Sequence, residues 1–434
     1  MFSYHLRLAL NSLRRTPVVA ALMIGAIALG VGVCITTLTV YRLMSGNPIE
    51  HRNDVLYAVT LDNWDANQPW DEKRPQLPPM ELTYRDATAL LESDIPARQV
   101  AMRKASFVVE GDPAAGVKPF LAVARLTTNA FFPMFDVPFL YGGGWDRGAD
   151  ENAERVVVLS HETNTKLFGG QDSVGKTVRL EGNDYKVVGV LDDWTVAPLV
   201  YDLNNGAFNE PEELFVPFRV GTVEELQSAG NVNCPGAEAL DSFKDFLNSN
   251  CVWIQFWAEL KDRDQREAYQ NFIDNYAREQ QALGRFQRPL NNHLRRPDEW
   301  LKLNEVVEND NQVLVGLSFM FLAVCLLNMI GLLLAKFLGA APMVGLRRAL
   351  GATRGTIFKQ HLVEVGVIGL GGGLLGIAVA ALGLLGVRQL YENYDALTRL
   401  DLTMGLIALA IAVASGVLAG LYMEIGRASC RERV

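Results

Sequence analysis

The chain has 434 residues, of which 49% are hydrophobic and 21% charged, and its net charge is −9. A composition this apolar and acidic excludes a nucleic-acid-binding protein. A single polar stretch, 45–310, has 266 residues, enough for an extramembrane domain with its own core.

Four stretches contain no Asp, Glu, Lys or Arg: 16–41, 313–335, 365–387 and 402–423. Each is long enough to cross an apolar layer of ~30 Å as a helix. A polar stretch, 45–310, separates the first from the other three. The sequence therefore predicts a membrane protein of four transmembrane α-helices in a 1+3 order, with a large α+β domain inserted between helices 1 and 2.

The basic residues predict the orientation of these helices. Residues 1–17 resemble an amphipathic helix and carry only basic charges, as does the loop 337–360. Both are expected in the cytoplasm by the positive-inside rule. The insert has 26 Lys and Arg against 43 Asp and Glu, which fits a translocated domain. We expect a multi-pass protein of the bacterial inner membrane, with its large domain in the periplasm.

The first apolar stretch is longer than the apolar region of a signal peptide, and no A-x-A cleavage site follows it. It is interpreted as a retained anchor. The expected segments are 1–17 (cytoplasmic), 18–43 (helix 1), 45–310 (periplasmic core domain of two subdomains), 311–336 (helix 2), 337–360 (cytoplasmic coupling loop), 361–387 (helix 3), 388–401 (short periplasmic loop) and 402–423 (helix 4). The tail 424–434 reads EIGRASCRERV, which resembles a translated sequencing adapter, and we expect it to be a gene-assembly artefact.

Alternating strand and helix patterns predict the α+β insert. Long helical patterns occupy 81–94 and 266–283, with a shorter one at 163–168. The expected strands are 56–61, 106–110, 119–126, 155–160, 177–180, 185–191, 213–218 and 252–259. Cys234 and Cys251 lie in this exported part, where oxidising conditions permit a disulfide, with two unpaired thiols as the alternative.

Residues 170–177, GQDSVGKT, match the P-loop pattern letter for letter. A P-loop needs a strand before it and a helix after it, so that helical N–H groups hold the phosphates. Here a helical pattern precedes and a strand pattern follows. We therefore interpret the match as a turn that leads into a hairpin.

Three segments together resemble the macrolide-exporter (MacB/FtsX-like) permeases of ATP-binding-cassette (ABC) systems. They are LALNSLRRTPVVAALMIGAIALGVGV at 8–33, VVVLSHETNTKLFGGQDSVGKTVRLEGNDYKVVGVLDD at 156–193, and VGLRRALGATRGTIFKQHLVEVGVIGLGGGLLGI at 344–377. The resemblance implies four helices, a periplasmic domain after the first, and transmission of ATP-driven motion across the membrane.

The resemblance also implies the partners: a cytoplasmic ABC ATPase, a second permease copy or paralogue, the lipid bilayer and, in an efflux system, a periplasmic adaptor and an outer-membrane channel. No cofactor is expected on this chain, because the partner ATPase would use the ATP. Three functions stay open: an exporter permease, an FtsX-like, non-transporting protein that activates a periplasmic cell-wall hydrolase, and a membrane-anchored enzyme or sensor. The third requires a catalytic constellation, which is not recognisable in the sequence.

The resemblance places ATPase coupling in the loop 337–360, on a short helix. The alternative is a basic loop that only sets the topology. One departure is the uncharged lead-in Ala340 to Met343, where the family usually has charged residues. The expected coupling residues are Met343, Gly345, Arg347, Arg348, Leu350 and Gly351.

Small residues recur at four-residue spacing in the last two apolar stretches and predict close packing among the last three helices or against a second permease. They are Gly369, Gly373, Gly376, Ala412, Gly416 and Gly420. The alternative is that apolar helices are simply rich in Gly and Ala. The five histidines show no metal-ligand spacing, and no catalytic constellation is recognisable. We expect neither a metal site nor an enzyme.

Overall fold

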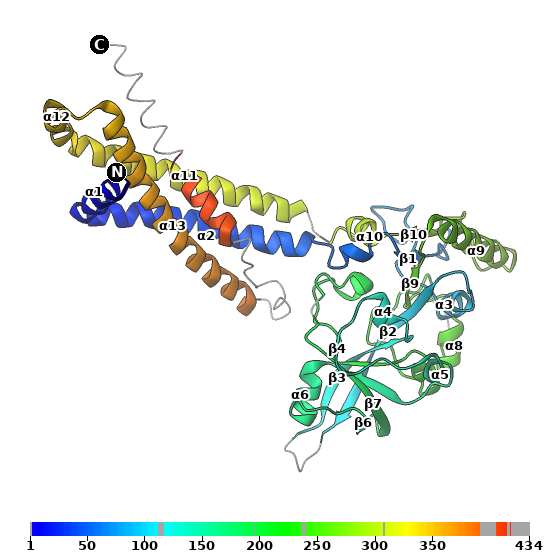
Figure 1. Ribbon diagram of the computed structural model, residues 1–434. Helices are drawn as coiled ribbons and strands as arrows, with labels where there is room; N and C mark the ends of the chain where they lie inside the picture. Colours follow the sequence, from blue (N-terminus) through cyan, green and yellow to red (C-terminus); the bar gives the residue numbers. More distant parts are fainter. Residues whose placement is uncertain are drawn as a thin grey trace. The chain divides into compact units, whose positions relative to one another are not determined.

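The computed structural model describes residues 2–111, 117–194, 196–236, 240–306, 309–390, 405–414 and 417. It separates into two compact units, a helical unit made of Met1–Gly46 with Val307–Val434 and an α+β unit, Asn47–Val306 (Figure 1). The predicted short loop 388–401 lies outside the described residues from position 391 on, and so does the tail 424–434.

Apolar helices build the helical unit. Its elements are α1 (Phe2–Arg15), α2 (Pro17–Ser45), α11 (Asn309–Gly339), α12 (Ala341–Ala349), α13 (Arg354–Leu390) and a described piece of a further helix, Gly405–Ala414. Three of them, α2, α11 and α13, are long and apolar enough to cross a membrane. The predicted fourth span, 402–423, is described only in part.

Helix α2 lies at the centre of this unit and packs against both α11 and α13. Met23, Ile27 and Val31 of α2 are fully buried, at the spacing of one helical face. In α11, Met329 and Leu333 face the same core. The amphipathic helix α1 packs against α13.

A sheet of ten strands forms the centre of the α+β unit, in the order β10-β1-β9-β2-β3-β8-β5-β7-β4, with β6 beside β2 and β7. Among the strands that the structure describes, only the pairs β3–β8 and β5–β7 are parallel. The strands are β1 (Leu56–Thr60), β2 (Arg98–Glu110), β3 (Phe120–Thr127), β4 (Phe139–Gly142), β5 (Val156–Leu159), β6 (Thr177–Leu180), β7 (Asn183–Leu191), β8 (Leu214–Pro217), β9 (Gln255–Glu259) and β10 (His293–Arg295).

Short helices and one long helix accompany the sheet. They are η1 (Glu50–Arg52), α3 (Tyr84–Leu91), α4 (Phe131–Met134), α5 (Arg147–Glu151), α6 (His161–Phe168), η3 (Val200–Asn205), α7 (Val220–Val223), α8 (Phe243–Asn248), α9 (Arg263–Ala282) and α10 (Pro297–Leu303). Side chains of Thr83, Ser160 and Asp262 cap the first turns of α3, α6 and α9. Such caps satisfy N–H groups that have no partner inside the helix.

Strand β2 connects the apolar clusters of the insert, and two subdomains within it stay a prediction. Because side chains alternate along a strand, its Val100 and Met102 enter one core and Ala101 another. Farther along, Phe107 and Val109 enter a third core. The same 13-residue strand is thus common to all three apolar clusters.

Candidate functional site

Helix α12 is the segment for which the sequence predicts coupling. Pro342 stands in its first turn, where a missing N–H breaks no helical hydrogen bond. After the helix and Leu350, Gly351 has a φ of +98°, a conformation that side-chain-bearing residues rarely adopt. Its N–H donates to the Arg348 C=O at 3.1 Å. Pro342 and Gly351 thus bound α12 as a separate helix between α11 and α13 (Figure 1).

Two predicted coupling residues, Met343 and Leu350, form an exposed apolar face together with Leu346, which was not among the predicted residues. Met343, Leu346 and Leu350 are 48%, 62% and 79% exposed, and their spacing of three and four residues places them side by side. A Cβ on Gly345 would meet nothing within 4 Å. Arg348 is exposed, with no acidic partner among the residues that the structure describes. An apolar face with a nearby cation suits a protein partner.

Arg347 and Arg348 are both expected as coupling residues, but their surroundings differ. Nη1 of Arg347 donates to Oε1 of Gln360 on α13 at 2.8 Å, and the side chain is half-buried. Arg347 therefore fixes α12 to α13, and Arg348 is the arginine that is available to a partner.

A polar cluster joins three helices of the same unit. Glu364 of α13 accepts a hydrogen bond from Ser12 Oγ of α1 at 2.7 Å and forms an ion pair with Lys336 of α11. His361 lies one turn before Glu364, with Nδ1 3.8 Å from its Oε2, and its ring packs edge-on against Phe337. We call Ser12, Lys336, His361 and Glu364 the Glu364 cluster.

Both charged side chains of the Glu364 cluster are buried. A charge inside an apolar helix bundle is expensive unless it is paired, so Lys336 and Glu364 fix the mutual register of α11 and α13. The sequence analysis missed Lys336 as a site residue. The available signal was one Lys at the end of one apolar stretch and one Glu just before the next.

The predicted packing glycines have defined neighbours. A Cβ on Gly373 would lie 2.8 Å from Cβ of Ala412, and one on Gly369 would lie 3.1 Å from the Ala412 C=O oxygen. Gly376 packs instead against Val31 of α2, a helix outside the expected group of the last three. Gly372 makes a similar approach to Ile27, so α13 presents small residues to two helices. Gly416 and Gly420 lie outside the described residues.

The segment that matches the P-loop pattern has a different geometry. Gly169 ends α6 in the left-handed conformation, and Thr177 begins the strand β6, which pairs with β7 as a hairpin. Lys176 Nζ lies 4.8 Å from the centre of the Phe168 ring. Because a strand follows where a phosphate-binding helix is required, the interpretation as a turn is confirmed.

Cys234 and Cys251 form a disulfide in the structure. Cys34 and Cys325, in the helical unit, are free and buried. Among the described residues, no group of three or more His, Cys, Asp and Glu side chains is placed to hold a metal ion.

A buried network of charges crosses the sheet of the α+β unit. Arg125 of β3 is fully buried and bonds Oδ2 of Asp202 at 2.5 Å, and it also pairs with Glu212. Lys104 of β2 lies 3.1 Å from the same Asp202 oxygen. Each buried charge thus has an opposite partner, as stability requires.

Glu81 borders this network, and its buried environment perturbs its pKa. It accepts a hydrogen bond from Gln255 of β9. Burial, with a smaller contribution from the charge of Asp202, raises the pKa of Glu81 to about 8. Glu81 therefore exchanges its proton near neutral pH, unlike an ordinary glutamate.

A bundle of apolar helices that carries a large α+β unit is the architecture of a membrane protein with one extramembrane domain. The family model of the MacB-like periplasmic core domain matches residues 20–276. That is more than half of the chain, and the chain belongs to this family. The resemblance to ABC transporter permeases of the MacB/FtsX type is confirmed.

Several curated proteins are similar to the chain. The macrolide export ATP-binding/permease protein MacB of Azoarcus sp. is 23% identical, over 63% of this chain and 36% of that protein. The pyoverdine export ATP-binding/permease protein PvdT of Pseudomonas syringae is 25% identical, over 67% of this chain and 39% of that protein. The ABC transporter permease YknZ of Bacillus subtilis is 23% identical, over 52% and 48%. The chain thus spans less than half the length of these relatives.

Two solved structures are also similar. The periplasmic region of MacB from Actinobacillus actinomycetemcomitans aligns with a TM-score of 0.37 and 13% identity, over 61% of this chain and 99% of that one. The extracellular domain of the noncanonic ABC-type transporter YknZ aligns with a TM-score of 0.31 and 16% identity, over 49% and 87%.

Proposed function

We propose that the chain is the permease subunit of an ABC-type export system. A separate ATPase subunit binds α12, and its ATP-driven motion passes through the helices to the periplasmic domain, which moves substrate from the periplasmic side. The exposed face of Met343, Leu346 and Leu350, on a helix fixed to α13, is the observation that carries this proposal.

The bonds within the helical unit supply a path for that motion. A partner that displaces α12 pulls on α13 through the Arg347–Gln360 hydrogen bond, and the Glu364 cluster links α13 to α11 and α1. Close packing at Gly372 and Gly376 links α13 to α2. Helices α2 and α11 are continuous with the two ends of the insert, so their displacement reaches it through the backbone.

The proposal includes four transmembrane helices, an inner-membrane location and a dimer of permeases. It assigns ATP to the partner and no cofactor to this chain. A periplasmic adaptor and an outer-membrane channel complete the export system.

Co-purification from the native membrane tests the proposal. We expect an ABC ATPase to be recovered in stoichiometric amount, together with a periplasmic adaptor. Recovery of the ATPase with a cell-wall hydrolase would indicate that the chain activates the hydrolase and is not an exporter. Recovery of no ATPase would contradict the proposal.

A further inference from the structure

One edge of β2 is paired at both ends and open in the middle. Residues 98–102 pair with β9, and residues 109–110 pair with β6. Between them, the Lys104 C=O accepts a hydrogen bond from the N–H of Ala229, and the Val108 N–H donates to Glu181. In the described part of the chain, no strand pairs with this edge at Ser106.

The backbone groups of Ser106 point toward this open edge. Ser106 lies opposite Val123 of β3, whose N–H and C=O both bond Glu213, at 2.9 and 3.0 Å. Directly opposed residues of an antiparallel pair exchange either both of their hydrogen bonds or neither. Val123 faces away, so the N–H and C=O of Ser106 face the edge, where no described residue bonds them. Such groups are a template for another strand.

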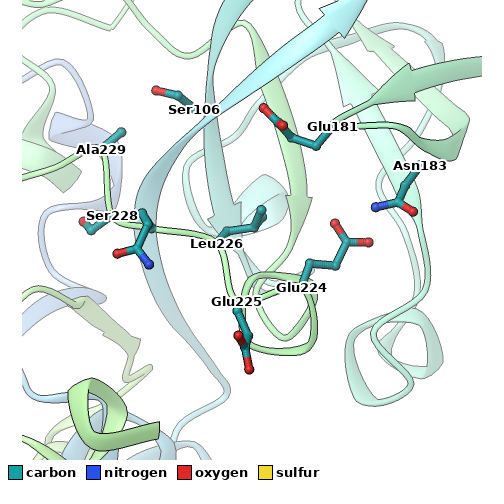
Figure 2. A pocket seen from close by; sticks show the side chains of 9 residues that line it. Ser106, Glu181, Asn183, Glu224, Glu225, Leu226, Ser228 and Ala229 are labelled. Carbon is teal, nitrogen blue, oxygen red and sulfur yellow. The ribbon is translucent and has the colours of Figure 1, made fainter. Parts of the chain in front are cut away.

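A pocket of about 530 Å³ adjoins this edge and is acidic. Figure 2 shows Glu181, Glu224 and Glu225 among the side chains that line it. Arg155 and the Tyr185 hydroxyl already bond Glu224, each at 2.6 Å. Glu181 and Glu225 are exposed, and neither forms an ion pair with any residue that the structure describes. Two carboxylates there are available to a cation.

The outer face of the sheet beside Ser106 is apolar. Val108 is opposite Leu121, and Ser106 is opposite Val123, so these side chains share one face of β2 and β3. Val108, Leu121 and Val123 are 42%, 65% and 37% exposed. An open strand edge, two carboxylates and an apolar strip therefore adjoin one another.

We propose that an extended, basic segment of a partner protein binds here as a short added strand. Its backbone pairs with the N–H and C=O of Ser106, a Lys or Arg side chain approaches Glu181 and Glu225, and an apolar side chain packs on Val123. Main-chain hydrogen bonds supply affinity in this mode of recognition, and the flanking side chains supply specificity. The inference does not depend on an ATPase partner.

Peptide binding to the full chain in detergent tests the proposal. The probe is an end-capped hexapeptide of alternating lysine and valine, and its control alternates glutamate and valine. We expect saturable binding of the lysine peptide in fluorescence anisotropy, no binding of the glutamate peptide, and slower amide hydrogen exchange at Ser106 in the complex. Absent binding, equal binding of both peptides or unchanged exchange at Ser106 would overturn the proposal.

Variants distinguish the contribution of the backbone hydrogen bonds to peptide affinity from that of the carboxylate charges. Ser106→Pro removes an N–H that has no internal partner and should weaken binding by roughly fivefold, whereas Ser106→Ala keeps the wild-type affinity. Glu181→Gln with Glu225→Gln should weaken binding by about tenfold. The control variant Glu279→Gln removes one carboxylate charge on α9, away from the pocket, and should leave the affinity for the peptide unchanged.

Equal affinity of wild type and a folded Ser106→Pro variant would refute strand addition. Unchanged affinity of the double glutamine variant would refute the choice of a basic partner. If the proline variant does not fold, the exchange measurement on the wild-type chain decides alone.

Discussion

Lys336 of α11 and Glu364 of α13 form an ion pair between two helices of a mainly apolar bundle. Removing one partner leaves the other charge buried and unpaired, which costs more than the pair contributes. Their mutual dependence gives the Glu364 cluster a measurable signature.

We predict that Glu364→Leu lowers the stability of the helical unit by about 3–5 kcal/mol and that adding Lys336→Met restores most of it. The reporters are Cys34 and Cys325, which are free and buried in this unit. Their reaction with a thiol dye on heating measures unfolding, in a Cys430→Ser background that removes the tail thiol. A double variant no more stable than the single one would contradict the pairing.

Glu81 gives a second residue-scale prediction, on pH. Its pKa is raised in the folded chain to about 8, so the folded state holds the proton more tightly than the unfolded state. Stability therefore falls as pH rises from the ordinary glutamate value toward 8. The pKa of Asp150 is raised to about 6, so Asp150 also lowers the stability as the pH rises, but only below about pH 6. The pKa of His293 is lowered to about 4, so His293 has the opposite effect: it raises the stability as the pH rises, below about pH 6.5.

We therefore predict that, between pH 6.5 and 8, the wild-type α+β unit loses stability with rising pH and Glu81→Gln loses much less. All seven tryptophans lie between positions 64 and 300, so tryptophan fluorescence on denaturant titration reports this unit alone. Parallel pH profiles of the two proteins would show that Glu81 is not the titrating group.

At the scale of elements, close packing of α13 against α2 depends on the absence of side chains. A Cβ on Gly372 would lie 2.6 Å from two carbons of Ile27, nearer than Cβ atoms approach in proteins. A Cβ on Gly366, two turns earlier on the same helix, would meet nothing within 4 Å.

We predict that Gly372→Ala destabilises the helical unit by about 1–3 kcal/mol. Gly366→Ala should leave it unchanged or stabilise it by up to ~1 kcal/mol, because alanine favours the helix. The thiol-dye assay measures both variants. Equal effects of the two substitutions would mean that α13 does not pack on α2 through Gly372.

Most of the α+β elements follow from local patterns. The strands predicted at 177–180 and 185–191 and the helix predicted at 163–168 lie where the structure has β6, β7 and α6. The first half of β2 was not predicted, because Arg103 and Lys104 make it look exposed. Both are buried, and their partners, Leu226, Gln227 and Asp202, are distant in the sequence.

The candidate site was predictable in its outline and less so in its contacts. A proline and a glycine bracket α12 in the sequence, and the apolar spacing of Met343, Leu346 and Leu350 is visible there. Arg347 bonds Gln360, and Arg348 does not. This difference depends on the turn of the chain at Gly351, which the sequence pattern does not give. Pairing of Lys336 with Glu364 likewise depends on the packing of α11 and α13, which spacing alone does not give.

At the scale of the whole molecule, the charges of the chain are divided between its parts. The stretch 45–310 carries a net charge of −17, whereas all the charged residues of the loop 337–360 are basic. We place the acidic stretch in the periplasm, and we propose that within the basic loop it is the helix α12, not the whole loop, that binds the ATPase.

Pull-down of the ATPase by variants of α12 tests that claim most directly. We predict that Leu346→Ala with Arg348→Glu lowers ATPase binding by two orders of magnitude or more, because apolar contact is lost and the charge is reversed. Lys359→Glu, an equal charge reversal at an exposed position of α13, should bind the ATPase normally. Undiminished ATPase recovery with the α12 variant, at normal membrane levels, would contradict the account.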